Sequence, residues 1–238
     1  MNHAVIFAGG VGSRMNNNPM PKQFLEINGK PIIIHTLEIF ENHPKIDGIY
    51  VACNEPWIPH LQKLVRKYCI EKLREIAPGG ETSQQSIYNA LNCIDEFDDE
   101  TIVLIHDGVR PLVDHATVTR SIAHARQHGS AVTCVSAYET VVVSDESGRV
   151  VDVLDRNSIK IARAPQTFFL KDIFDVHKKA LADGVSNVID SCSLMRLYEK
   201  DVHTVEGRYE NIKVTTPEDF YILRSLFEIR ENMQIMGI

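Results

Sequence analysis

The chain has 238 residues, a length that fits one compact domain, and we predict a single domain over residues 1–238. Its 32 Asp and Glu against 25 Lys and Arg give a net charge of −7, which argues against an extended surface for nucleic acid or an anionic membrane. The five cysteines are scattered without a CxxC pair, a usage that excludes a disulfide framework or zinc site and suits a reducing cytoplasm. The sequence shows neither a signal peptide nor an apolar run near the roughly 20 residues that cross a bilayer, so we expect a cytoplasmic protein with no membrane partner.

Short apolar runs alternate along the chain with longer segments of helical periodicity. This alternation predicts an α/β fold, a Rossmann-like, mostly parallel sheet with helices on both faces. The predicted strands lie near residues 3–8, 46–53, 101–106, 131–137 and 202–206. Helices are predicted over residues 31–42, 82–95 and 115–127, and from Pro217 to about Glu231. Thr82 with Ser83, and Asp114, are the residue types that cap helix starts.

One segment interrupts this alternation. Residues 138–155 contain two valine-rich runs separated by Asp-Glu-Ser-Gly at 145–148, a pattern that predicts a β-hairpin. We predict that this hairpin, at about 138–163, projects from the body as a dimerisation arm. Periodicity alone leaves open the alternative that it folds back on its own domain.

A glycine-rich loop follows the first predicted strand, with Gly9, Gly10 and Gly12 in quick succession. Open α/β sheets bind ligands at this position, and glycine backbones let N–H groups approach phosphate oxygens. Arg14 and Lys22 add two cations to the same loop, which together could clamp the charge of a transferring phosphoryl group. The loop lacks the third glycine of a dinucleotide-binding turn and the Gly-Lys-Ser/Thr of a P-loop.

Two further motifs flank the expected strand ends. A Gly79-Gly80 pair precedes the second predicted helix, whose amino-terminal N–H groups could bind a nucleotide. Asp107 ends the third strand beside the first loop, where its carboxylate could help to hold a Mg²⁺ on a triphosphate. From the residues alone, Asp107 could equally be a turn or cap residue, and Arg110 could pair with it.

The order Ala-Gly-Gly-x-Gly-x-Arg-Met at 8–15, followed by Pro-Lys-Gln-Phe at 21–24, resembles the loop of a known family. That family contains 2-C-methyl-D-erythritol 4-phosphate cytidylyltransferase and D-ribitol-5-phosphate cytidylyltransferase. Motifs at 79–86, 106–111, 155–157, 164–168 and 206–215 extend the resemblance over nearly the whole chain. The resemblance implies an enzyme that joins CMP from CTP to a polyol phosphate and releases pyrophosphate, with Mg²⁺ as its cofactor.

The resemblance also assigns expected site residues. Those implied to bind the nucleotide are Phe7, Ala8, Gly9, Gly10, Gly12, Gly79, Gly80, Glu81, Ser86, Asp107 and Gly108. Those implied to be catalytic are Arg14, Lys22, Arg156 and Lys213. Arg156 and Lys213 are also expected to bind the acceptor, together with Asp190, and Asp107 is the expected metal ligand. Since the matching arginine reaches into the neighbouring subunit's site, the resemblance implies a homodimer.

The acceptor's own phosphate is the expected nucleophile. It is mostly a dianion near neutral pH, so no general base is needed, and the sequence offers no Ser/His/Asp or Cys/His arrangement for one. The methylerythritol branch normally carries Thr-Asp-Glu where this chain has Ile189-Asp190-Ser191, and Thr-Pro-Gln where it has Ala-Pro-Gln at 164–166. These differences favour D-ribitol 5-phosphate, giving CDP-ribitol. The alternatives are 2-C-methyl-D-erythritol 4-phosphate, in isoprenoid synthesis, and a catalytically silent nucleotide-binding homologue.

Overall fold

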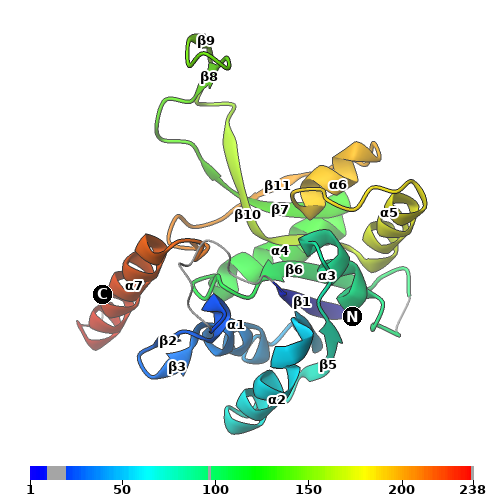
Figure 1. Cartoon of the computed structure of the whole chain (residues 1–238), viewed down its shortest axis with the longest axis vertical. Coiled ribbons are helices and arrows are strands. Elements are labelled where there is room, and N and C mark those ends of the chain that lie inside the picture. The colour runs from blue at the N-terminus through cyan, green and yellow to red at the C-terminus, as the bar shows by residue number, and fades with distance from the viewer. Residues whose placement is uncertain (10–19, 96–97, 237–238) are drawn as a thin grey trace.

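The computed structural model describes residues 1–9, 20–95 and 98–236, and its centre is one twisted sheet (Figure 1). The strand order is β11-β7-β10-β6-β1-β4-β5, with parallel pairing except for β10, which runs antiparallel to β6 and β7. The strands are β1 (Asn2–Ala8), β4 (Gly48–Cys53), β5 (Leu73–Pro78), β6 (Ile102–Asp107), β7 (Ser130–Ser136), β10 (Lys160–Phe169) and β11 (Thr204–Glu206). The predicted mostly parallel sheet is therefore confirmed.

Helices cover both faces of this sheet because its central strands are apolar on both sides. In β1, Ala4 and Ile6 pack into one core, whereas Val5 between them packs into the other. The first core also contains residues of α1 (Ile32–Glu41), α2 (Ile58–Lys67) and α4 (His115–His128). The second contains residues of α3 (Ser83–Leu91), α5 (Leu170–Ala182) and α6 (Ser191–Leu197).

The helix α7 (Pro217–Met236) packs at one end of the body (Figure 1). There Leu223 joins a small buried cluster with Ile27, Leu112 and Val214. Ile27 belongs to the ribbon of β2 (Glu26–Ile27) and β3 (Lys30–Pro31), which follows the short helix η1 (Lys22–Phe24); a second short helix is η2 (Glu55–Trp57). None of the helices formed by the described residues combines the length and apolarity needed to cross a membrane.

The hairpin consists of β8 (Val142–Ser144) and β9 (Val150–Val153), which pair antiparallel and stand away from the body (Figure 1). The Asp145 carboxylate accepts hydrogen bonds from the backbone N–H groups of Ser147 and Arg149 at 3.0 and 3.1 Å, and Gly148 takes a φ of +83°, a conformation that favours glycine. The arm ends earlier than residue 163, because Lys160 already pairs with Ser136 of β7. Its role in dimerisation stays a prediction.

Several elements were not predicted from the sequence: α2, β5, α5, α6 and the full length of β10. In β10, Pro165 lies within the strand, although a proline normally argues against a central strand because it lacks an N–H donor. Here it falls between Ala162 and Gln166, where the pairing of β10 with β7 shifts register. The ladder therefore tolerates the missing donor at this position.

Candidate active site

The candidate site lies where the parallel strands β1 and β6 end side by side. Phe7 and Asp107 are partners in the register of these strands, and the Gly108 N–H donates to the Phe7 carbonyl at 3.1 Å. A Cβ on Gly108 would lie 2.7 Å from Cδ1 of Ile33 and 3.1 Å from Cβ of Ala8, so a larger residue would require the Ile33 side chain to shift. This packing holds Asp107 beside the start of the first loop, as predicted.

The first loop also contacts the loop before α3. A Cβ on Gly9 would lie 2.9 Å from the Ser86 hydroxyl and 3.5 Å from Cα of Gly79, which shows how closely the two loops approach. The buried Gln23 side chain donates to the Ala8 carbonyl at 2.7 Å and ties η1 to the same place. The predicted nucleotide-binding residues Ala8, Gly9, Gly79 and Ser86 therefore come together.

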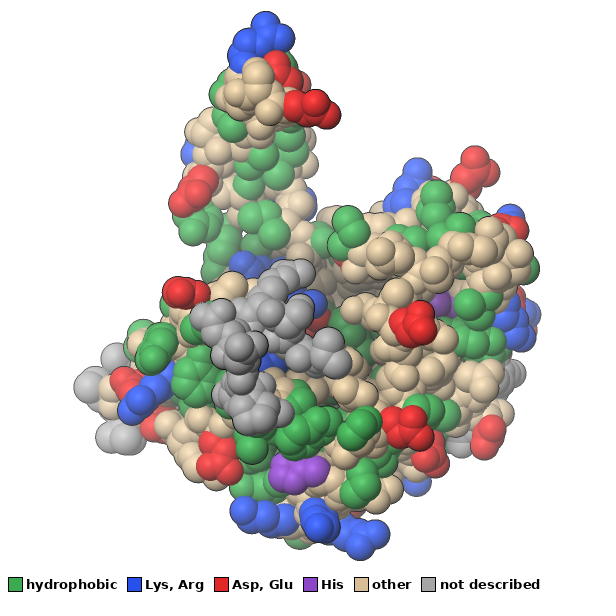
Figure 2. All heavy atoms as spheres, in the orientation of Figure 1, with side chains coloured by type: hydrophobic (Ala, Val, Ile, Leu, Met, Phe, Trp, Pro, Cys, Tyr) green, Lys and Arg blue, Asp and Glu red, His purple; other side chains and the backbone are tan. Residues whose placement is uncertain are grey.

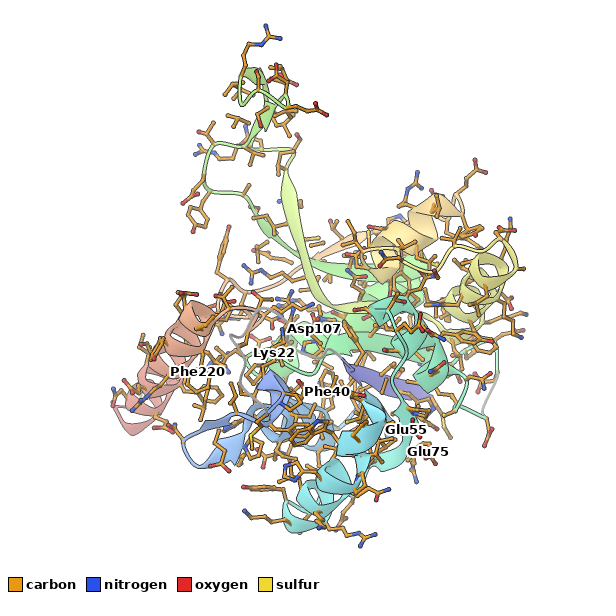
Figure 3. The ribbon with its side chains drawn as sticks, in the orientation of Figure 1. Lys22, Phe40, Glu55, Glu75, Asp107 and Phe220 are labelled. Atoms are coloured by element: carbon orange, nitrogen blue, oxygen red, sulfur yellow. The ribbon has the colours of Figure 1, made fainter. Side chains whose placement is uncertain are left out.

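Lys22 begins η1 next to this contact and is drawn in the same central region as Asp107 (Figure 3). Gly10, Gly12 and Arg14 lie outside the described residues, so their predicted roles in phosphate binding are not tested here.

The loop before α3 is held by its own side chains. Thr82 is the N-cap, and its hydroxyl accepts from the Gln85 N–H at 3.1 Å, as the sequence predicted. The Gly80 N–H donates to the Ser86 hydroxyl at 2.9 Å and the Glu81 N–H to the Gln85 amide oxygen at 3.1 Å. Both N–H groups are thus engaged within the loop, and nucleotide binding by Gly80 and Glu81 stays a prediction.

Asp107 is the charged centre of the site. It is 5% exposed, and its two oxygens face Nε of Arg110 at 2.6 Å and Nζ of Lys213 at 2.5 Å. Burial works to raise the pKa of this carboxyl, but the two cations outweigh burial and hold the pKa at about 2. Lys213 also lies over the Phe7 ring, 5.6 Å from its centroid. The predicted residues Phe7, Asp107 and Lys213 therefore form one cluster.

Arg163, on β10, adds a further cation that the sequence did not single out. Its Nη1 donates to the Asn211 carbonyl at 2.8 Å, and Arg110 Nη1 donates to the same carbonyl at 2.9 Å. Asn211 in turn donates its side-chain N–H to the Ala164 carbonyl at 2.6 Å. Within residues 1–9, 20–95 and 98–236, no carboxylate forms an ion pair with Arg163. No sequence motif pointed to this residue, because its proximity to Arg110 depends on the path of β10.

A cavity of about 210 Å³ opens beside this cluster. One end is lined by charged side chains: Asp107, Arg110, Arg163 and Lys213. The rest of its wall comes from β10, α3, α5 and the start of α6 and includes Gln84, Gln166, His177, Asp190 and Ser191. Three cations against one carboxylate make the charged end suitable for an anion such as a phosphate.

Asp190 lines the cavity, where the sequence predicted an acceptor-binding residue. It is the N-cap of α6, accepting from the Ser193 N–H at 2.8 Å, and its other oxygen accepts from the Gln166 amide at 2.8 Å. Gln166 also accepts from the Cys192 N–H at 2.8 Å. These bonds fix the start of α6 against β10. Gln166, His177 and Ser191 were not predicted as site residues.

Arg156 lies on the arm, where its Nη1 donates to the Tyr138 carbonyl at 3.1 Å. It does not line the cavity of its own chain, and its action in a partner's site stays a prediction.

Asp107 is the predicted metal ligand, and the donor groups around it limit how a metal ion could be held. Asp107 is the carboxylate at the charged end of the cavity, and no group of three His, Cys, Asp or Glu suited to a metal occurs among the described residues. Mg²⁺ in nucleotide enzymes often takes one or two carboxylates and fills its shell with phosphate oxygens and water. The residues present fit a Mg²⁺ held mainly by a bound triphosphate with Asp107 as the protein ligand, but not a cage built from protein groups.

The chain is similar to known proteins in both sequence and fold. The family model described as 2-C-methyl-D-erythritol 4-phosphate cytidylyltransferase matches residues 2–228. A ribitol-5-phosphate cytidylyltransferase of Vibrio parahaemolyticus is 50% identical over 238 residues, covering 100% of both chains. A 2-C-methyl-D-erythritol 4-phosphate cytidylyltransferase of Clostridium botulinum is 37% identical over 227 residues, which is 95% of this chain and 97% of that one.

Among solved structures, the 4-diphosphocytidyl-2C-methyl-D-erythritol synthase of Anaerococcus prevotii superposes with a TM-score of 0.84 at 27% identity, covering 95% of this chain and 96% of that chain. The match therefore extends to the arrangement of the sheet and helices as well as the sequence. The chain belongs to the 2-C-methyl-D-erythritol 4-phosphate cytidylyltransferase family of nucleotidyltransferases.

Proposed function

We propose that this protein transfers CMP from CTP to D-ribitol 5-phosphate, forming CDP-ribitol and releasing pyrophosphate. The observation that carries the proposal is the level of identity to the two kinds of relative. Three ribitol-5-phosphate cytidylyltransferases of Streptococcus agalactiae are each 46% identical over the whole chain, like the Vibrio protein at 50%. The methylerythritol enzyme of Clostridium botulinum is 37% identical over 95% of this chain, and that of Geotalea uraniireducens is 38% identical over 94% of this chain.

The cavity supports a phosphorylated acceptor. The protein as a whole carries a net charge of −7, so a phosphate needs a local excess of positive charge to bind. Arg110, Arg163 and Lys213 supply that excess at one end of the cavity, with Asp107 as the counter-charge. The polar groups along the rest of the wall, which include the Asp190 carboxylate, suit hydroxyls.

In the proposed reaction, an oxygen of the acceptor phosphate attacks the α-phosphorus of CTP in line with the leaving group. A new P–O bond forms, the bond from the α-phosphorus to the bridging oxygen breaks, and pyrophosphate leaves with the electron pair. Because the acceptor phosphate has a second pKa of about 6, it is already largely dianionic and no base has to remove a proton. Lys213 holds this phosphate, while Arg14 and Lys22 stabilise charge on the triphosphate.

Asp107 would hold the Mg²⁺ that accompanies CTP, and the ion would neutralise charge on the phosphate oxygens when bound. The ion pair of Asp107 with Lys213 at 2.5 Å keeps both groups in place before substrates arrive. Catalysis would then depend mainly on positioning and on charge stabilisation by preorganised side chains.

The working unit in this proposal is a homodimer in the cytoplasm, paired through the arm. The valines of the arm are exposed in a single chain: the exposed fraction is 49% for Val142, 53% for Val150 and 59% for Val153. Apolar side chains cover part of the arm's surface (Figure 2). A projecting apolar hairpin of this kind is stabilised when a second copy covers it. Pairing would bring Arg156 of one subunit to the acceptor phosphate in the other.

The proposal is tested by incubating the purified protein with CTP, Mg²⁺ and one acceptor at a time, and measuring pyrophosphate and the CDP-linked product. D-Ribitol 5-phosphate should give the highest kcat/KM, with 2-C-methyl-D-erythritol 4-phosphate well below it. UTP replaces CTP in a parallel series to measure base selectivity.

Two results would overturn the proposal. Faster turnover of the methylerythritol acceptor would assign the protein to that branch. Binding of CTP without pyrophosphate release on any polyol phosphate would indicate a silent nucleotide-binding homologue.

A further inference from the structure

Two polar side chains in the cavity wall have no hydrogen-bond partner within the part of the chain that the structure describes. His177 is 1% exposed and both its ring nitrogens are unpaired; Ser191 is 3% exposed and its hydroxyl is unpaired. Both residues line the cavity that begins at Asp107 and Lys213. Buried polar groups are nearly always hydrogen-bonded, because an unpaired buried donor or acceptor keeps the full cost of its desolvation. Because both residues line the same cavity, a ligand bound there could supply the missing bonds.

The neighbouring polar groups in the wall are satisfied by one another. Gln84 donates to the Val185 carbonyl at 2.7 Å and accepts from the Val188 N–H at 2.9 Å. Gln166 and Asp190 are likewise joined at 2.8 Å. These bonds fix the positions of α3, α6 and the segment between α5 and α6. At the cationic end Arg163 Nε is also unpaired, but that side chain is held through its Nη1. His177 and Ser191 therefore stand out as side chains of the wall with none of their polar atoms paired among the described residues.

Both unpaired groups are uncharged at neutral pH and can donate as well as accept. Burial lowers the pKa of His177 to about 4, so the neutral ring offers one N–H donor and one nitrogen acceptor. The Ser191 hydroxyl has the same dual capacity. A ligand hydroxyl also donates and accepts, which makes an alcohol the matching chemistry. An anion would be poorly matched, because these two groups supply no positive charge.

The cavity therefore has a cationic end and a polar end whose groups include one carboxylate, Asp190, and a phosphorylated polyol has a matching asymmetry of phosphate and hydroxyls. Ile87, Ile105 and Val188 line the cavity as well and can contact the C–H groups of a carbon chain. We propose that His177 and Ser191 hydrogen-bond the hydroxyls at the unphosphorylated end of the acceptor and thereby select its chain length. This inference rests on the proposed function, since it assumes that the acceptor's phosphate occupies the charged end.

The test compares D-ribitol 5-phosphate with D-erythritol 4-phosphate, which has the same phosphate and one fewer hydroxyl-bearing carbon. The kcat/KM for each is measured in the wild type, in His177→Leu and in Ser191→Ala. Each variant should lower the preference for the longer acceptor by roughly 5- to 10-fold, the factor expected for one neutral hydrogen bond. The change should fall on the KM for the acceptor, with the KM for CTP altered less than about twofold, as expected when an interaction made equally in the ground state and the transition state is lost.

Thr167 provides a matched control. Its hydroxyl is also buried and unpaired among the described residues, but it does not line the cavity. Thr167→Val should keep the wild-type preference. Removing an unpaired buried polar group should not destabilise the fold, and Ser191→Ala, which deletes a single oxygen, carries the test by itself if His177→Leu does not fold.

The outcomes separate this inference from the proposed function. If the wild type turns over both acceptors and the variants keep its preference, or lose both acceptors equally, His177 and Ser191 do not read chain length and the inference is overturned. If the wild type releases no pyrophosphate with any polyol phosphate, the proposed function fails first and the inference fails with it.

Discussion

At the scale of single residues, the ion pairs of Asp107 decide how the site is prepared for substrate. Arg110 is held by both Asp107 and the Asn211 carbonyl, so it supports the carboxylate and is not free to move to a ligand. Nζ of Lys213 lies 2.5 Å from Oδ1 of Asp107, and the lysine side chain is 38% exposed. Lys213 can therefore exchange this ion pair for one with a phosphate. We therefore assign Arg110 a positioning role and Lys213 the contact with the acceptor.

Lys213→Met should reduce kcat/KM for the polyol phosphate by roughly 10²-fold, because it removes one preorganised positive charge from the reacting centre. The measurement is steady-state kinetics with CTP held saturating. Lys171→Met is the matched control: it removes a lysine that pairs with Asp99 at 2.7 Å on the exposed surface, where such pairs contribute little. Near-wild-type activity of Lys213→Met would remove this residue from the mechanism.

The sequence predicted part of this cluster. The run from His106 to Pro111 foretold that Asp107 ends a strand near the first loop and that Arg110 could pair with it, since both depend on local spacing. Lys213 was predicted only through the family resemblance, because its contact with Asp107 joins distant parts of the chain. Ser191 stood in the sequence only as part of the Ile189-Asp190-Ser191 difference between the two branches, and no motif pointed to His177. That both are unpaired could not be predicted, since an unpaired buried group is defined by its three-dimensional surroundings and not by its residue type.

At the scale of secondary-structure elements, the arm and strand β10 form one continuous piece of chain. The Ala137 N–H donates to the Ile159 carbonyl at 3.2 Å, so the two ends of the arm are neighbours at its base. Replacing residues 139–157 by Asn-Gly, a sequence that favours a tight hairpin turn, should therefore leave the sheet intact. We expect a folded monomer by sedimentation and circular dichroism, with acceptor turnover reduced by roughly 10²-fold through loss of Arg156.

Subunit mixing is the sharper control for this prediction. Arg156→Ala and Lys213→Met should each be nearly inactive alone, but a heterodimer of the two contains one site with both residues intact. Mixing equal amounts under exchange conditions should restore about a quarter of the wild-type activity, since half the dimers are mixed and each has one complete site. A mixture that stays inactive would show that Arg156 does not act across subunits.

Element prediction worked best where capping and periodicity are strong. Thr82 and Asp114 do cap α3 and α4, accepting from the N–H groups of Gln85 and Thr117. It did not give the full length of β10, because a proline within a run argues against a strand and the strand's antiparallel place between β6 and β7 depends on distant pairing. That strand supplies Arg163 and Gln166, so the missed element accounts for part of the missed site.

At the scale of the whole molecule, stability should depend on pH through buried histidines. His177 has a folded-state pKa of about 4, below its ordinary value of 6.5, because burial disfavours the charged ring. Between pH 6.5 and 4 the unfolded chain therefore binds a proton that the folded chain does not, so the free energy of unfolding falls as the pH is lowered through this window. The protonation difference at His177 should lower the free energy of unfolding by about 3 kcal/mol near pH 4.

Urea unfolding at pH 7.0 and 4.5 measures this effect. Between the two pH values, the free energy of unfolding of His177→Leu should fall by about 2 kcal/mol less than that of the wild type. That of Thr167→Val should fall as much as that of the wild type. Equal losses in all three proteins would mean that His177 is not the titrating group.

The polar end of the cavity has a further consequence for how acceptor choice can change over time. Gln166, His177, Asp190 and Ser191 come from β10, α5 and α6, which follow one another directly along the chain, while the glycine loop lies far upstream in the sequence. One recombination event within the gene can therefore replace this stretch and leave the CTP-handling loop untouched. Enzymes with new alcohols as substrates can arise from such exchanges without rebuilding the transfer chemistry.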